Sequence, residues 1–553
     1  MKPLIIPFLL LFLLAGLSCQ PSGEGPYDLI IQNARVVDGT GNPWYEADVG
    51  IYHDKIVAIG KLDARLAKRV VDAGGKVLAP GFIDMLGQSE RAILVDNRAM
   101  SKISQGITTE INGEGESPAP VNDKILKEMK PYLDELKLTV DWTDFNGYFS
   151  RVEQNRSAIN LGSYVGATTA REYVLGFDNR EPTTDELNEM KQLVRSAMQQ
   201  GAMGVSSALE YVPAKFAKTP ELIELAKASA EFGGIYASHI RNEQEKSIEA
   251  VLEAADIARA AKIPVEIWHL KVAQKPNWGK MSEVVRIIQQ QRNEGLDLTA
   301  DQYPYIASSN DFKAWLPGWV QEGGTEKLMQ RLQDPIARKQ IKKELATAKW
   351  LDFQIVMISS VSNPTLKKWE GKRFSDVISA WKKEPLDAMF DFLIADSGRT
   401  SRVTFSMTED DLRMGMAQTW TSFCTDEAGQ PTEGPLSEGM PHPRAFGSFP
   451  RVLAKYVREE KILTLEDAIR KMTSLPAQRL GIKNRGILKT GFYADLVLFD
   501  PATVTDKATF ENPHQYSEGI SLVLVNGMPV WENGKFTGNL PGRVLRGPGY
   551  VRQ

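Results

Sequence analysis

Residues 234–269 read GIYASHIRNEQEKSIEAVLEAADIARAAKIPVEIWH, and the architecture can be worked out from this stretch. Apolar, strand-like runs at its two ends, 234–239 and 264–269, enclose a segment with helical periodicity. A strand, a helix and a second strand in this order predict a parallel βαβ unit. Each strand ends in a histidine, His239 in the first and His269 in the second.

The same alternation continues on both sides of this unit. The helical segments carry start signals such as Thr183 with Glu186, which predicts a capping box. Eight βα units favour a closed (β/α)₈ barrel over an open sheet, so we expect an α/β protein with a TIM-like barrel. The expected strands are residues 77–84, 106–112, 160–165, 204–207, 234–239, 264–269, 298–303 and 421–426.

Both ends of the chain are rich in short strand-like runs interrupted by turn residues. Because chain ends often lie close together, we expect residues 27–78 and 486–545 to form one small β-sandwich domain, and residues 79–485 to form the barrel. The interval between residues 303 and 421 is too long for a barrel connection and predicts an insertion at about 305–400. This insertion either shapes the barrel mouth or is a folded decoration.

Composition excludes several classes of protein. The chain has 553 residues with 66 basic and 70 acidic side chains, a formal net charge of −4. It has no positive excess to neutralise phosphates, so we expect no nucleic-acid partner. Two cysteines, Cys19 and Cys424, are too few for a disulfide framework.

The first residues predict export. A lysine at position 2 and an apolar run over residues 4–17 are typical of a signal peptide, expected here at 1–18. Residues 16–19 (GLSC) resemble a loose lipobox, and 19–26 would form a short tether. We therefore expect a periplasmic or outer-membrane-anchored lipoprotein, whose membrane attachment is a lipid on Cys19. Plain secretion is the alternative.

Four residues indicate metal chemistry at one end of the barrel. His239 and His269 end successive strands, and the carboxyl ends of barrel strands form the active-site face. Glu114 follows the second strand, and Asp426 ends the eighth. Two imidazoles with one carboxylate suit zinc, and a further carboxylate can transfer protons. In the alternative, structural interpretation, the histidines are satisfied within the core and the acids cap helices or pair with arginines.

Several longer motifs resemble a known family. Residues 79–84 (APGFID) and 491–497 (GFYADLV) are similar to the amidohydrolase superfamily. Its D-aminoacylase (N-acyl-D-amino-acid deacylase) group is the best match, and the resemblance extends from about residue 28 to 538. It implies a barrel with a β-sandwich and hydrolysis of an N-acyl-D-amino acid to a carboxylate and a free D-amino acid. The segments that resemble this group are 209–213 (LEYVP), 238–243 (SHIRNE), 268–271 (WHLK), 441–444 (PHPR) and 446–451 (FGSFPR).

The sequence departs from this pattern in the first barrel strand. The superfamily usually carries His-x-His after Phe-Ile-Asp, whereas this chain has Leu86 and Gln88 at those positions. Glu114 stands where the D-aminoacylase group has a metal-bridging cysteine. Since leucine cannot bind a metal, we expect one Zn²⁺, or another divalent ion, held by Glu114, His239 and His269. For Gln88 and Glu90 we expect a structural role; the alternative is that one of them holds water or substrate.

The remaining roles are implied by the resemblance. Asp426 is expected to carry the proton from water to the leaving amine. Arg444 is expected to bind the substrate carboxylate through two hydrogen bonds. Lys271 is expected to make a second positive contact, and Tyr211 to donate from its hydroxyl. Two other functions stay open: a metallo-dipeptidase or deacylase acting on cell-wall fragments with D-residues, and an inactive ligand-binding barrel. The sequence leaves the acyl group, the amino acid, the metal and the oligomeric state open.

Overall fold

The computed structural model describes residues 26–552, and the structural statements below concern these residues. The expected signal peptide at 1–18, Cys19 and the first part of the tether lie outside the described residues, so export and lipid attachment stay predictions. Within 26–552, no helix has both the length and the apolar character needed to cross a lipid bilayer.

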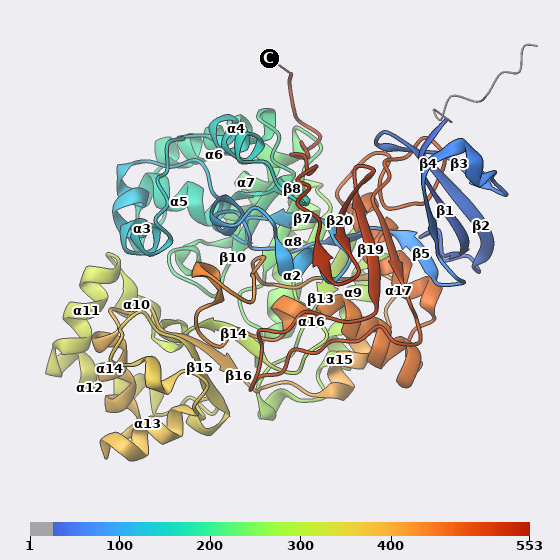
Figure 1. Cartoon of the computed structure of the whole chain (residues 1–553). Coiled ribbons are helices and arrows are strands. Elements are labelled where there is room, and N and C mark those ends of the chain that lie inside the picture. The colour runs from blue at the N-terminus through green and yellow to red at the C-terminus, as the bar shows by residue number, and fades with distance from the viewer. Residues whose placement is uncertain (1–25, 553) are drawn as a thin grey trace, which may run out of the picture.

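A parallel barrel wrapped by helices forms the centre of the protein (Figure 1). Each of the eight expected strands has a counterpart, which confirms the α/β barrel. Two sheets make up its wall. The two sheets join at Tyr164 on one side of the barrel. On the other side they are connected by a hydrogen bond from the Asp426 amide to the Leu86 carbonyl at 3.0 Å. The barrel strands are β6 (Phe82–Asp84), β7 (Ile107–Asn112), β8 (Asn160–Ser163) with β9 (Val165–Gly166), β10 (Gly204–Ala208), β11 (Ile235–His239), β12 (Val265–Ile267), β13 (Leu298–Gln302) and β17 (Thr421–Phe423).

The expected strand at 77–84 is divided between two sheets. Its first part, β5 (Val77–Pro80), belongs to a terminal sheet, and only β6 lies in the barrel. The chain passes from one sheet to the other at Gly81, whose amide donates to the Asp495 carbonyl at 2.8 Å. A Cβ atom at Gly81 would lie 2.2 Å from Thr108 Oγ1, so only glycine fits this crossing.

Helices cover the outside of the barrel, and their ends follow the local sequence. In α6 (Thr184–Gln199), Thr183 and Glu186 form the predicted capping box. In α8 (Ser247–Ala261), the buried residues recur at helical spacing and face the strands. The other α-helices outside the insertion are α1 (Ala92–Val95), α2 (Met100–Ile103), α3 (Asp123–Leu136), α4 (Phe145–Asn155), α5 (Ala167–Leu175), α7 (Thr219–Ala230), α9 (Met281–Asn293), α15 (Glu409–Met416), α16 (Arg444–Arg451), α17 (Leu465–Met472) and α18 (Ser474–Arg479).

Both ends of the chain contribute to a second sheet, packed beside the barrel. β5 pairs in parallel with β1 and antiparallel with β18, so one sheet joins the N-terminal and C-terminal segments. Its buried face consists of leucine, isoleucine, valine and alanine side chains from both ends. The strands are β1 (Tyr27–Val36), β2 (Tyr45–Tyr52), β3 (Lys55–Gly60), β4 (Ala67–Asp72), β5, β18 (Leu496–Phe499), β19 (Ile520–Val525), β20 (Met528–Glu532) and β21 (Lys535–Phe536).

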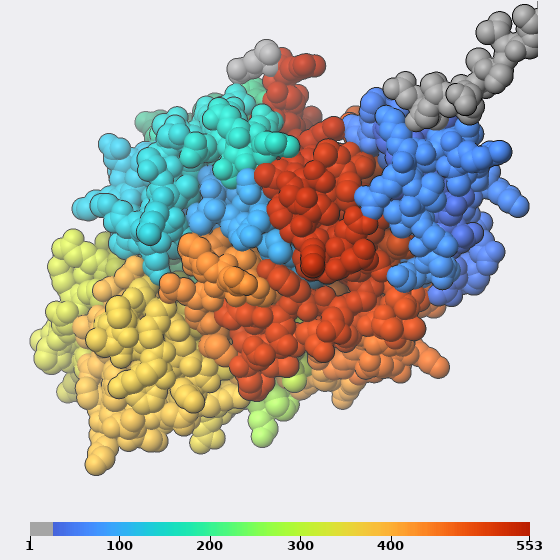
Figure 2. All heavy atoms as spheres, in the orientation of Figure 1, coloured from blue at the N-terminus to red at the C-terminus, as the bar shows by residue number. Residues whose placement is uncertain are grey.

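After β21 the chain leaves this sheet and runs along the barrel. The amide of Gly542 donates to the Ser157 carbonyl, and that of Leu545 to the Leu161 carbonyl, each at 2.8 Å. Figure 2 shows the C-terminal part of the chain, in red, between the N-terminal sheet and the barrel helices. This contact ties the two units together.

The interval between β13 and α15 forms an insertion with its own core (Figure 1, yellow). A three-stranded antiparallel sheet connects it to the barrel, and five helices pack around apolar side chains such as Phe312, Phe374 and Phe392. Its elements are β14 (Ser308–Asp311), α10 (Gly318–Gln321), α11 (Thr325–Gln333), α12 (Pro335–Leu345), β15 (Val356–Ser360), α13 (Phe374–Trp381), α14 (Pro385–Ala395) and β16 (Ser401–Thr404).

Candidate metal centre

The structure brings the three expected metal ligands together at the carboxyl ends of the barrel strands. Glu114 follows β7, His239 ends β11 and His269 follows β12. The Oε1 atom of Glu114 lies 2.9 Å from His239 Nδ1 and 2.9 Å from His269 Nε2. One ligand atom of each residue lies within 4.8 Å of the other two. One cation can therefore contact all three side chains.

In each histidine, the ring nitrogen that does not face Glu114 lies close to another carboxylate. His239 Nε2 lies 3.2 Å from Glu210 Oε2, and His269 Nδ1 lies 3.0 Å from Glu243 Oε1. A carboxylate that accepts the proton of one ring nitrogen leaves the other nitrogen free to bind a metal. Glu210 and Glu243 therefore orient the rings.

The electrostatics of this cluster favour positive charge. Burial lowers the pKa of His239, but the surrounding carboxylates, Glu243 first, raise it more, to about 10. Glu243 itself is buried, which raises its pKa, yet Lys271 and the two histidines lower that pKa below the usual range. The site attracts either protons or a metal ion, and two imidazoles with a carboxylate are a donor set suited to zinc. The residues present thus fit the expected cation.

Glu210, His239 and Glu243 also lie close enough to form a second ligand group. This group uses the opposite nitrogen of His239 and offers one imidazole with two carboxylates. Zinc favours nitrogen ligands more strongly than such an acidic set provides. Glu114, His239 and His269 are therefore the better zinc site of the two.

Gln88 occupies the space between the ligand group and the expected proton carrier. Its amide nitrogen Nε2 lies 2.6 Å from Glu114 Oε2 and 2.7 Å from Asp426 Oδ1. The other strand-one position, Leu86, is fully buried in the core and offers no ligand. The amide group of Gln88 thus bridges two carboxylates whose residues lie far apart in the sequence. Gln88 is therefore placed to orient both carboxylates, which is compatible with the structural role expected from the sequence.

Three residues of the site have left-handed backbone conformations. The φ angles are 54° at Gln88, 37° at His269 and 53° at Asp426. Such conformations are uncommon outside glycine and cost on the order of 1–3 kcal/mol each. The surrounding hydrogen bonds stabilise these backbone conformations. The conformations direct the three side chains into one cluster.

Asp426 forms an ion pair with Arg444. The Arg444 Nη1 atom lies 2.6 Å from Asp426 Oδ2, and the guanidinium carbon lies 4.5 Å from the ring centre of Tyr303. Burial raises the pKa of Asp426, and Arg444 opposes that rise. His442 anchors this segment, because its Nδ1 accepts from the Arg444 amide at 3.0 Å and its Nε2 donates to the Ala307 carbonyl at 3.0 Å.

The two other expected substrate contacts also lie in the cluster. Lys271 Nζ donates to Glu243 Oε1 at 2.6 Å and lies 2.8 Å from His269 Nδ1. The Tyr211 ring packs edge-on against the His239 ring with centres 4.9 Å apart, and its hydroxyl accepts from Asn310 Nδ2 at 3.2 Å. Their roles toward a substrate stay predictions.

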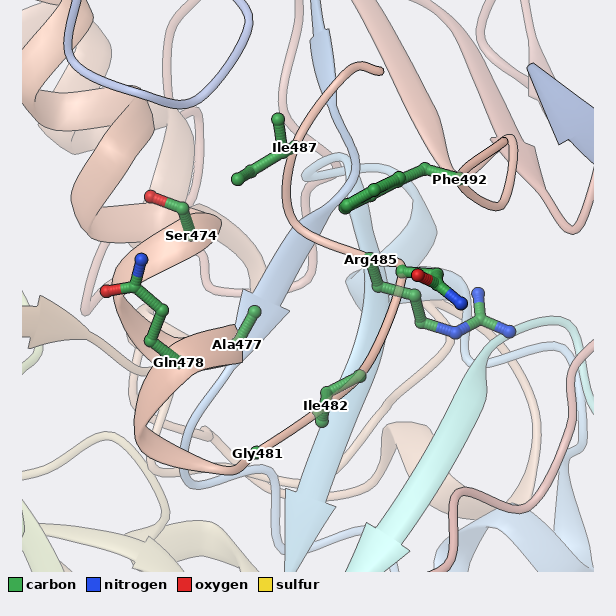
Figure 3. Close-up of a pocket in the computed structure, with 9 residues that line it drawn as sticks. Ser474, Ala477, Gln478, Gly481, Ile482, Arg485, Ile487 and Phe492 are labelled. Carbon is green, nitrogen blue, oxygen red and sulfur yellow. The ribbon is translucent and has the colours of Figure 1, made fainter. Parts of the chain in front are cut away.

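A separate cavity of about 290 Å³ lies where α18 meets the loop before β18 (Figure 3). Ala477, Ile482, Ile487 and Phe492 line it together with Arg485. None of the metal-site residues contributes to its wall. This cavity is distinct from the candidate centre.

Comparisons with known proteins show the family of this chain. A family model described as the amidohydrolase family matches residues 435–531. The chain is 34% identical over 525 residues to a D-aminoacylase of Alcaligenes xylosoxydans xylosoxydans, covering 95% of this chain and 98% of the relative. The chain belongs to the D-aminoacylase group of the amidohydrolases.

Two solved structures of this group have the same fold. The N-acyl-D-glutamate deacylase from Bordetella bronchiseptica, solved with zinc and a phosphonate mimic of the tetrahedral intermediate, matches with a TM-score of 0.80 and 31% identity over 94% of this chain and 99% of that one. A D-aminoacylase described by one-metal activation and second-metal attenuation of its binuclear centre matches with a TM-score of 0.79 and 33% identity over 94% and 100%.

Sequence reasoning missed two residues of this cluster, Glu210 and Glu243, and did not foresee that Gln88 contacts both Glu114 and Asp426. Glu210 and Glu243 lie within motifs that resemble the family, and each is close in sequence to a residue already singled out. A carboxylate one position before Tyr211, or four positions after His239, could have indicated a hydrogen-bond partner for a histidine ring that binds a metal. For Gln88 the signal was its place where the superfamily carries a histidine.

Proposed function

We propose that this chain is an exported, zinc-dependent hydrolase that cleaves the amide bond of N-acyl-D-amino acids. One observation carries the proposal: Glu114, His239 and His269 converge on one point, and Asp426 lies beside them. Asp426 Oδ1 is 2.7 Å from the amide nitrogen of Gln88, which also contacts Glu114. The names of the relatives support the D-amino acid, and the first residues of the sequence support export.

The residues present suit hydrolysis by a single metal ion. A zinc ion held by Glu114, His239 and His269 supplies Lewis acidity toward water and toward the scissile carbonyl. Glu210 and Glu243 keep the histidine rings in the tautomers that metal binding requires. Gln88 donates to the remaining oxygen of Glu114, so this carboxylate is held from both sides.

Asp426 is placed to move the proton. As water adds to the carbonyl carbon, its proton passes to the Asp426 carboxylate, and Asp426 then gives it to the leaving nitrogen while the C–N bond breaks. The products are a carboxylic acid and an amine, and transfer of the acid's proton to the amine gives the carboxylate and the ammonium form of the amino acid. Gln88 and Arg444 contact different oxygens of Asp426 and fix the orientation of the carboxyl group.

Arg444 is assigned to the carboxylate of the leaving amino acid. Its guanidinium is buried and stacks on the Tyr303 ring, which limits its movement. An arginine can bind a carboxylate through two parallel hydrogen bonds and so fix the substrate's orientation as well as its charge. Lys271 and Tyr211 complete the proposed contacts with the substrate.

A substrate panel tests this function. The purified full chain, loaded with Zn²⁺, is assayed with N-acetyl D- and L-amino acids and with dipeptides ending in a D-residue. We expect turnover of N-acetyl-D-amino acids, its loss on chelation and its return with zinc. Preferential cleavage of the dipeptides would instead favour the cell-wall alternative. A protein that binds these ligands but hydrolyses none of them would overturn the proposal.

A further inference from the structure

Arg402, on β16 of the insertion, is a buried cation without a counter-ion. It is 3% exposed, and its Nη1 donates to the hydroxyl of Thr404. Its Nε has no acceptor, and no carboxylate oxygen of residues 26–552 lies within 4.0 Å of the guanidinium. Lys271 and Arg444, by contrast, each have a carboxylate oxygen 2.6 Å away.

The surroundings of Arg402 do not compensate for this burial. A buried guanidinium is costly unless it is paired and hydrogen-bonded. Burial lowers the pKa of Arg402 to about 10, and the charge of Glu210 only partly opposes this. The Trp315 ring, 4.3 Å from the guanidinium carbon, stabilises the cation through its face but offers no acceptor. Arg402 is therefore well oriented but lacks an anion.

Arg402 lies next to residues of the metal centre. In the antiparallel ladder between β14 and β16 it pairs with Asn310, and paired residues project from the same face of a sheet. Asn310 Nδ2 donates to the Tyr211 hydroxyl, and the Tyr211 ring packs on the ring of His239. One ladder pair and one hydrogen bond thus separate Arg402 from a side chain that touches a metal ligand.

The same strand also reaches the proposed clamp for the substrate carboxylate. The carbonyl oxygen of Ser309, the neighbour of Asn310, accepts from Arg444 Nη2 at 3.4 Å. β14 therefore runs between Arg444 and Tyr211, and Arg402 is paired with Asn310, the residue of this span that contacts Tyr211. The insertion supplies one wall of the site.

We propose that Arg402 anchors a second carboxylate-binding subsite in this wall, so that the preferred substrates carry a carboxylate in addition to the one assigned to Arg444. Trp315 and Thr404 hold the guanidinium, and Nε and Nη2 remain as the two donors that can bind a carboxylate side-on. The inference rests on the proposed function and names its substrate class. The second carboxylate belongs either to the side chain of the D-amino acid or to the acyl group.

Two substrate pairs test the subsite. N-Acetyl-D-glutamate and N-acetyl-D-glutamine have nearly the same shape and differ in charge; N-succinyl-D-leucine and N-acetyl-D-leucine place the extra carboxylate on the acyl group. We expect one pair to show a preference for the charged member. Arg402→Met should lower kcat/KM for that member by about ten- to hundredfold, the value of a charged hydrogen bond, and leave the neutral member within about threefold. The pair that responds identifies the source of the carboxylate.

A second arginine of the insertion gives a matched control. Arg338 has carboxylate partners in Asp387 and Asp391 on α14, so Arg338→Met should leave both substrate ratios unchanged. If Arg402→Met does not fold by circular dichroism, Arg402→Lys carries the same test, because it keeps the charge and loses the planar fork. Ratios unchanged by either folded Arg402 variant would overturn the subsite.

Calorimetry separates this inference from the proposed function. Zinc-loaded protein is titrated with D-glutamate, D-glutamine and succinate, which tests binding without turnover. Binding of a dicarboxylate that is weakened at least tenfold in Arg402→Met supports the subsite, even where no substrate is hydrolysed and the proposed function has failed. Equal binding of D-glutamate and succinate by the wild type and the folded variant contradicts it.

Discussion

Gln88→Leu tests whether a side-chain amide organises the centre. Leucine fills a similar volume but cannot donate to Glu114 Oε2 or Asp426 Oδ1, which lie 2.6 Å and 2.7 Å from the amide nitrogen. Hydrogen bonds to charged groups contribute about 1.5–3 kcal/mol each. If the bond to Asp426 acts on proton transfer, its loss lowers kcat by about ten- to hundredfold. The bond to Glu114 supports a metal ligand, and its loss should weaken metal affinity by about 10–100-fold.

Two assays separate these effects. Turnover is measured with zinc in excess, so that weakened binding does not reduce the active fraction, and zinc affinity is measured by competition with a chromophoric chelator. Gln291→Leu is the matched control, because Gln291 accepts from Arg259 at 2.6 Å on the outer helix α9, away from the centre. We expect the control to keep both values. A Gln88→Leu protein that folds with wild-type kcat and wild-type zinc affinity would refute the reasoning.

Other residues give further predictions. Asp426→Asn should lower kcat by about 10²–10⁴-fold with one zinc ion still bound by elemental analysis, and a wild-type kcat would exclude proton transfer by Asp426. Glu114→Ala should lose that zinc on dialysis; retention of one ion per chain would show that the ligand set is wrong. Arg444→Lys should raise KM for an N-acetyl-D-amino acid at least tenfold but change little for its carboxamide analogue, and an equal effect on both substrates would contradict the clamp. Burial and then Glu116 raise the pKa of Glu172 from 4.5 to about 8. The folded state therefore holds a proton that the unfolded state releases, and its stability falls as pH rises between these values. Glu172→Gln should thus be more stable than wild type at pH 8, by ~4 kcal/mol at most, and nearly equal at pH 4 in urea unfolding; a difference independent of pH would refute this.

The three candidate ligands could be named from the sequence because strand ends are visible in a sequence. His239 ends an apolar run that alternates with helices, and in a parallel barrel all such ends lie on one face. Glu210 and Glu243 were not assigned, since both follow a strand in loops without a periodic pattern. Their closeness to the histidines depends on loop conformation, which local propensity does not encode.

The sequence alone determined that this chain forms a parallel barrel with its chemistry at one rim, because hydrophobic periodicity specifies the strands and their order specifies the edge at which they end. Only the tertiary structure decided which atoms meet there. Gln88 bridges Glu114 and Asp426, and Arg402 lies one strand from Tyr211. These contacts depend on backbone turns and on pairings between residues that are up to hundreds of positions apart in the sequence. The physical reason is that such contacts depend on the closure of the whole barrel and the packing of the insertion. No local stretch of sequence carries that information.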